Sequence, residues 1–79
     1  MTVDDLKKLI ADALEVAPAD VDDESSTETL EVWDSLGHIN VLVALDAALD
    51  GKVAGIEGMK QAYSVPKLVA LLREQALLD

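Results

Sequence analysis

The first apolar residues of the chain recur at helical spacing. They follow one another at intervals of 3, 3, 1, 3 and 1 residues and are Val3, Leu6, Leu9, Ile10, Ala13 and Leu14. This spacing is typical of one face of an amphipathic helix. Thr2 has the side chain of a helix N-cap, and Pro18 disfavours helical backbone at Ala17. The pattern predicts a helix from Val3 to about Ala17.

Helical periodicity is absent between Pro18 and Trp33. This stretch is acidic and rich in hydroxyl groups, most densely from Asp20 to Glu28. A loop of this length inside one small domain is uncommon and is usually either functional or disordered. Apolar side chains at Val21, Leu30 and Trp33 are available to anchor it, so we expect an ordered loop with mobile parts.

A second apolar stripe at helical spacing consists of Leu36, Ile39, Leu42, Val43, Leu45 and Leu49. The segment from Val41 to Leu45, taken alone, is equally consistent with a buried strand. The length of the whole stripe and the alanines inside it favour a helix from Ser35 to about Leu49, with Gly51 placed to end it. Because apolar residues occupy several faces, this helix either lies at the centre of the core or leaves an apolar surface for partners.

The last third of the chain predicts one short and one longer helix. Three of the four glycines lie from Gly51 to Gly58, which indicates a flexible connection. The short helical turn is expected at Ile56, Met59 and Ala62. Ser64 is placed to cap the last helix, with Pro66 in its first turn. The apolar stripe of that helix is Leu68, Val69, Leu71, Leu72 and Ala76.

The predicted fold class is therefore all-α. We expect a small four-helix bundle of three longer helices and one short helix, with a long acidic loop between the first two. Residues 1–79 are expected to form a single domain with an aliphatic core, since the chain has one Trp, one Tyr and no Phe. A core of this kind is expected to admit an apolar guest.

Composition excludes several classes of function. The chain has no Cys, which rules out disulfides, thiolate zinc sites and a cysteine nucleophile. Its 16 acidic and 6 basic residues give a net charge of −10, which opposes binding to nucleic acid or anionic lipid and favours a basic protein partner. No apolar run approaches the roughly 20 residues that a membrane span needs. No secretory signal is visible, so we expect a cytoplasmic protein without a membrane span.

The negative charge is concentrated before Ser35. Residues 1–34 carry 11 acidic residues and 2 lysines, whereas residues 35–79 carry 5 acidic and 4 basic residues. An Asp or Ser immediately before an apolar stripe is typical of a helix N-cap, and a cap alone is the commoner meaning of such a junction. Three features favour a further role for Ser35. Free N–H groups at a helix start favour a phosphodiester, the carboxylates upstream suit a basic enzyme, and the chain offers no other reactive group.

Catalytic and metal-binding alternatives find little support. Ser35 and His38 are close enough in sequence to meet on one helix, but a serine nucleophile needs an oriented base and an oxyanion hole. We therefore expect no catalytic residue, and we expect His38 to be exposed or to face a partner. The acidic side chains between Asp20 and Glu24 lack the spaced pattern of a calcium loop, so no metal site is predicted.

The Asp34-Ser35-Leu36 triplet lies near mid-chain at the start of the second helix, in an acidic chain with a long first loop. With the short third helix and the valine- and leucine-rich last helix, it resembles the acyl carrier protein family over residues 2–78. The resemblance implies that a phosphopantetheinyl transferase, which itself holds magnesium, attaches 4'-phosphopantetheine from coenzyme A to Ser35. The thiol of that arm would hold an acyl group as a thioester. Asp34 and Leu36 match the positions of transferase contact.

The resemblance also implies that the second helix docks on basic patches of acyl-activating, condensing or acyl-transfer enzymes. These would belong to fatty-acid, polyketide or related lipid biosynthesis. The positions expected to face such partners are Gly37, His38, Asn40, Val41 and Asp46. Fatty-acid carriers commonly have more exposed acids on this helix, which here keeps only Asp46 and Asp50. We therefore expect a monomeric, specialised carrier rather than a general fatty-acid carrier.

Two alternatives remain open. One is a peptidyl or D-alanyl-type carrier, with an aminoacyl group as cargo. The other is an acidic helical interaction domain that is never modified, in which case the placement of Asp34-Ser35-Leu36 is a coincidence. The acidity favours the acyl carrier, and the acid-poor second helix keeps the aminoacyl carrier open.

Overall fold

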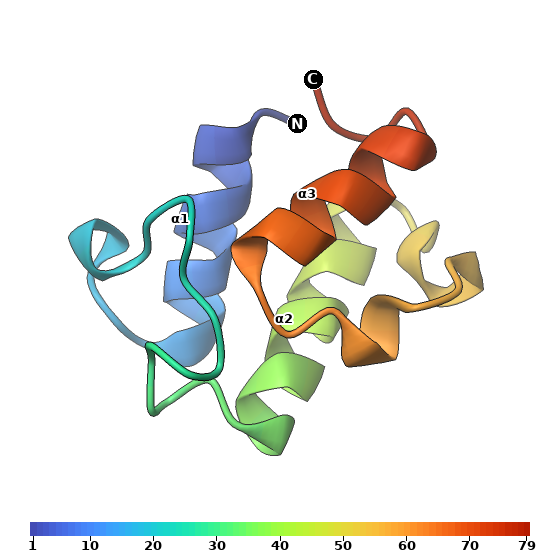
Figure 1. The fold of residues 1–79 in the computed structure, drawn as a ribbon. Helices are drawn as coiled ribbons and strands as arrows, with labels where there is room; N and C mark the ends of the chain where they lie inside the picture. Colours follow the sequence, from blue (N-terminus) through green and yellow to red (C-terminus); the bar gives the residue numbers. More distant parts are fainter.

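The structure, a computed structural model, describes residues 1–79 and is all-helical (Figure 1). Its α-helices are α1 (Val3–Leu14), α2 (Ser35–Ala48) and α3 (Val65–Glu74). Single 3₁₀ turns lie in the loops: η1 (Pro18–Asp20) before the acidic stretch, then η2 (Val53–Gly55) and η3 (Met59–Gln61) between α2 and α3. The predicted all-α class is confirmed.

Helix α1 begins as predicted but ends earlier. The Thr2 hydroxyl accepts a hydrogen bond from the Asp5 N–H, and the Asp5 carboxylate accepts one from the Thr2 N–H. The hydrogen bond from the Thr2 N–H lowers the pKa of the Asp5 carboxyl. The predicted end near Ala17 is wrong, because Glu15 adopts a left-handed conformation with φ of 60°. The Val16 N–H then bonds the Ala11 carbonyl, which closes the helix in a Schellman ending.

Helix α2 runs antiparallel to α1 and packs beside it (Figure 1). The preference for a helix over a strand is confirmed. The two alternatives for this helix were a central position in the core and an exposed apolar surface, and α2 has both. One face enters the core through Val41 and Leu45, each 0% exposed, while Leu36 and Val43 on another face are 68% and 64% exposed. The apolar stripe predicted the helix but not which face of α2 is buried, because α2 carries apolar residues on both sides.

The predicted short fourth α-helix is not confirmed. Two 3₁₀ turns, η2 and η3, occupy the segment instead, and Ile56 and Ala62 lie outside them. Gly58 separates the two turns with φ of 90°, a left-handed conformation that an α-helix cannot include. The molecule therefore has three α-helices rather than a four-helix bundle.

One core joins all three α-helices. Its largest fully buried side chains are Trp33, Leu6, Ile10, Leu45, Leu68, Leu72, Val41 and Val65. Trp33 comes from the end of the acidic loop, so the core is aliphatic around a single indole ring. A hollow of about 580 Å³ lies beside α2, as described below, and two residues of the core, Val53 and Met59, help to line it.

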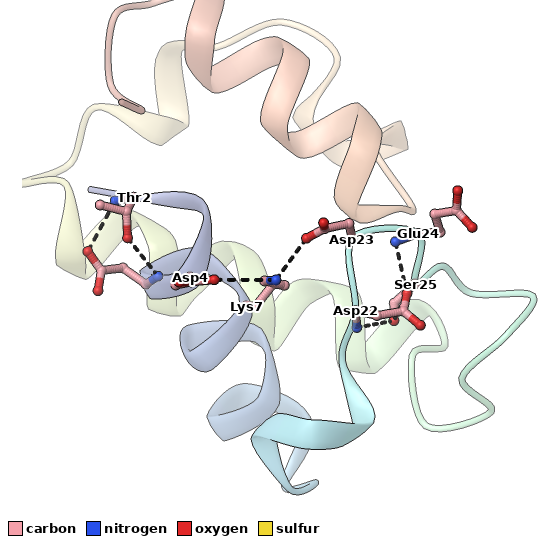
Figure 2. A network of polar contacts seen from close by, with 8 residues as sticks. Thr2, Asp4, Lys7, Asp22, Asp23, Glu24 and Ser25 are labelled. Carbon is pink, nitrogen blue, oxygen red and sulfur yellow. Dashed lines mark hydrogen bonds and ion pairs between the residues drawn. The ribbon is translucent and has the colours of Figure 1, made fainter.

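The acidic loop is anchored along its length. Val21 and Trp33 are buried and Leu30 is half-buried, as the sequence led us to expect. The Ser25 hydroxyl donates to the Asp22 carboxylate and accepts from the Asp22 N–H (Figure 2). Ser25 itself is only 3% exposed, and its carbonyl accepts the Val65 N–H at the start of α3. The loop is thereby tied to α3.

Lys7 connects the same loop to α1. Its ammonium lies 2.8 Å from Asp23 and 3.4 Å from Asp4. Both contacts are drawn as dashed lines in Figure 2. The hydrogen bond to Asp23 raises the pKa of Lys7. Lys7 thus offsets part of the negative charge where the loop passes closest to α1.

Candidate functional site

Ser35 is the first residue of α2 and is exposed. The cap of the helix is supplied by its neighbour: the Asp34 carboxylate accepts the Gly37 N–H at 2.8 Å. Because Asp34 caps the helix, the Ser35 hydroxyl is not needed for that purpose. Asp34 and Leu36 are exposed on either side of it. The three residues of the triplet are therefore presented together at one end of α2.

His38 is buried, so the prediction of an exposed or partner-facing residue is wrong. It is 3% exposed, and its Nδ1 accepts the indole N–H of Trp33 at 3.0 Å. The ring hydrogen is therefore on Nε2, which donates to the Met59 carbonyl at 2.8 Å. The Tyr63 ring packs against the imidazole with centroids 4.7 Å apart. Both nitrogens have partners, which allows a polar ring to sit inside the core.

Gly37 and Val41, two further positions expected to face partners, are also buried. With His38 they point toward the core side of α2. Gly37 has a specific packing role, because a Cβ atom there would lie 2.5 Å from the Val32 carbonyl oxygen and 2.9 Å from Leu14. Only a residue without a side chain lets the start of α2 lie this close to the end of α1.

The exposed face of α2 carries a different set of residues. Of the predicted docking positions only Asn40 is exposed; Asp46 is half-buried and accepts the Ala54 N–H at 3.2 Å. The large exposed apolar side chains around Asn40 are Leu36, Ile39 and Val43. Leu36 was predicted as a transferase contact, whereas Ile39 and Val43 were not among the predicted site residues. Ile39 follows Leu36 by three residues and Val43 follows Ile39 by four, and this spacing was the available signal, since it places all three on one face.

An open groove of about 580 Å³ runs between α2 and the segment that contains η2 and η3. Its apolar lining includes Leu42, Val43, Val53, Ile56 and Met59. Asp46, Glu57 and Lys60 are among its polar residues. Since a helix rises about 1.5 Å per residue, Leu42 lies about 10 Å along α2 from Ser35. The groove is therefore displaced from Ser35 along the same helix.

A smaller hollow of about 370 Å³ lies directly beside the triplet. It is lined by Thr27, Glu31, Trp33, Asp34, Ser35 and Tyr63. Two of these residues carry carboxylates, so the immediate surroundings of the Ser35 hydroxyl are negative. This sign suits a basic enzyme that approaches Ser35.

The protein contains no group of three or more His, Asp or Glu side chains arranged to hold a metal ion. None of its helices combines the length and the apolar character needed to cross a bilayer. A scan against models of protein families, a search of curated proteins and a search of solved structures each returned no match.

Proposed function

We propose that this protein is a carrier that bears 4'-phosphopantetheine on Ser35 and holds acyl groups as thioesters on that arm. The supporting observation is the free presentation of the Ser35 hydroxyl at the exposed first position of α2, where Asp34 takes over the capping. The exposed N-terminus of a helix also favours the phosphodiester that attachment creates.

Attachment is a phosphoryl transfer carried out by a separate phosphopantetheinyl transferase. The Ser35 oxygen attacks the pantetheine-bearing phosphorus of coenzyme A, and the bond from that phosphorus to the bridging oxygen breaks. Adenosine 3',5'-bisphosphate leaves, and the serine proton passes to a base of the transferase. Asp34 and Leu36 are exposed beside the hydroxyl and are proposed as transferase contacts. The carrier itself contributes the nucleophile and catalyses nothing.

The groove beside α2 is the proposed place for the cargo. It lies along the helix that begins at Ser35, and its apolar lining suits an acyl chain at the end of a flexible arm. We therefore place the cargo against Leu42, Val53 and Ile56, at the edge of the core.

The exposed face of α2 is the proposed surface for the enzymes that load and use the cargo. These are acyl-activating, condensing or acyl-transfer enzymes of lipid or related biosynthesis. The face is apolar at Leu36, Ile39 and Val43 and polar without charge at Asn40. This composition supports a specialised carrier, because a surface of this kind has little charge with which to meet a strongly basic patch.

Intact-mass measurement tests the proposal. Incubation with coenzyme A and a transferase of broad specificity is expected to add one phosphopantetheinyl group to the wild-type protein. Ser35→Ala is expected to gain nothing, whereas Ser26→Ala, which removes a hydroxyl from the acidic loop, is expected to gain the same mass as the wild type. Absence of any gain with several transferases of proven activity would overturn the proposal.

An aminoacyl carrier is the second candidate. The exposed face of α2, which is poor in acidic residues, supports this candidate. Charging of the pantetheinyl form by adenylating enzymes distinguishes the two cargoes. Loading with an amino acid but not with simple carboxylic acids supports the second candidate. Protein isolated from its native host without any added mass supports an interaction domain that is never modified.

A further inference from the structure

The turn that carries Ser35 is held from both sides by a pair of buried aromatic rings. With Asp34 as the N-cap of α2, Trp33 occupies the position before the cap and His38 occupies the fourth helical position. An apolar pair at these two positions forms a hydrophobic staple, which fixes the angle at which the chain enters a helix. Here the staple is also hydrogen-bonded, at 3.0 Å between the two ring nitrogens, with ring centroids 6.0 Å apart.

Ser35 lies between the two members of this staple. The side chains of Ser35 and of its neighbours Asp34 and Leu36 are exposed. The backbone of the turn is held by Trp33, two residues before Ser35 and 0% exposed, and by His38, three residues after it and 3% exposed. The direction of the Ser35 Cα–Cβ bond is set by that backbone. Close packing of Gly37 against the Val32 carbonyl removes further freedom from the same turn.

The staple extends to the groove beside α2. The second imidazole nitrogen of His38 donates to the carbonyl of Met59, which is one of the groove-lining residues. One buried ring therefore joins the turn of Ser35 through Nδ1 and the wall of the groove through Nε2. These two bonds can be removed separately.

We infer that Trp33 and His38 are positioning residues for the attachment of phosphopantetheine to Ser35, acting through the hydrogen bond between their rings. The inference rests on the proposed function. Neither ring touches the transferase or coenzyme A, because both are buried. Their effect is to hold the Ser35 Cα–Cβ bond in one direction before the transferase binds, so that less ordering remains for the reaction step.

Two substitutions of His38 separate positioning from general packing. Asparagine places its amide oxygen near the position of Nδ1 and retains an acceptor for Trp33. Glutamine places its amide nitrogen near the position of Nε2 and retains a donor for Met59. Trp33→Phe keeps an aromatic ring in the core but removes the indole donor. Ile10→Val, at a fully buried position of α1, serves as the control for a small loss of core packing.

The measurements are kcat and KM for attachment, with NMR spectra to establish that each variant is folded. Trp33→Phe and His38→Gln are expected to lower kcat roughly 10- to 100-fold with little change in KM, as a misplaced nucleophile does. His38→Asn and Ile10→Val are expected to stay within a few-fold of wild type. NMR order parameters of the backbone N–H groups of the turn at Ser35 are expected to fall only in the two impaired variants.

Several results would overturn the inference. If the wild type is modified and Trp33→Phe reacts at the same rate, the ring pair has no positioning role. If His38→Asn and His38→Gln lose activity equally, His38 acts only through packing. If the wild type gains no phosphopantetheine from active transferases, the proposed function itself is wrong and the inference falls with it.

Discussion

At the scale of single residues, Gly37 and His38 decide how α2 begins. Gly37 brings the helix start against α1, and His38 fills the space between Trp33, Met59 and Tyr63. Neither role could be predicted from the sequence. A lone histidine in a helix that is apolar on several sides gives no sign of whether it faces inward, and the backbone partner on Met59 comes from 21 residues away.

Gly37→Ala is expected to destabilise the fold by about 1–3 kcal/mol, because the added methyl group meets a backbone oxygen that cannot move aside. This cost outweighs the roughly 1 kcal/mol by which alanine favours a helix over glycine. Urea denaturation measures the difference in free energy of unfolding. Gly55→Ala is the matched control, since nothing lies within 4 Å of a Cβ atom there. Equal effects at the two positions would contradict the packing role of Gly37.

At the scale of elements, the starts of the helices were easier to predict than their ends. Thr2 and Ser64 cap α1 and α3 as the sequence indicated. Each helix ends near a left-handed residue that is not glycine: Glu15 after α1, Asp50 after α2 and Ala76 after α3. Glutamate and alanine carry no signal for this conformation, which is why the end of α1 was misplaced.

Ala76→Gly is expected to stabilise the protein by about 1 kcal/mol, because glycine adopts the left-handed conformation without the steric cost of a Cβ atom. The same substitution inside α3, at the exposed Ala70, is expected to destabilise by about the same amount. Thermal and urea denaturation of both variants measure the two effects. If both substitutions change the stability of the protein in the same direction, the left-handed conformation of Ala76 does not determine the effect of Ala76→Gly.

At the scale of the whole molecule, the chain combines three α-helices with a net charge of −10. The all-α class and the position of Ser35 at the start of α2 were predictable, because caps and apolar periodicity are local signals. The sequence did not predict which face of α2 is buried, and it did not predict the pair of 3₁₀ turns before α3. Both depend on how distant segments pack, and Gly58 interrupts the local pattern there.

Salt is expected to stabilise the folded state. The net charge of −10 makes repulsion between carboxylates the dominant electrostatic term, and added ions screen it. The ion pairs of Lys7 with Asp4 and Asp23 oppose this trend, but ion pairs at the surface contribute little to stability. The urea midpoint is therefore expected to rise when sodium chloride is raised from about 0.01 M to about 0.5 M, because the Debye length falls from about 30 Å to roughly 4 Å. A falling midpoint would mean that attractive pairs outweigh the repulsion.

The buried ring of Trp33 has one more consequence. It is the sole indole of the chain, it lies two residues before Ser35, and its N–H is bonded to His38. Indole emission depends on the polarity and hydrogen bonding around the ring. The protein therefore contains an intrinsic fluorophore at the turn where attachment is proposed, and optical titration can follow that turn without any added label.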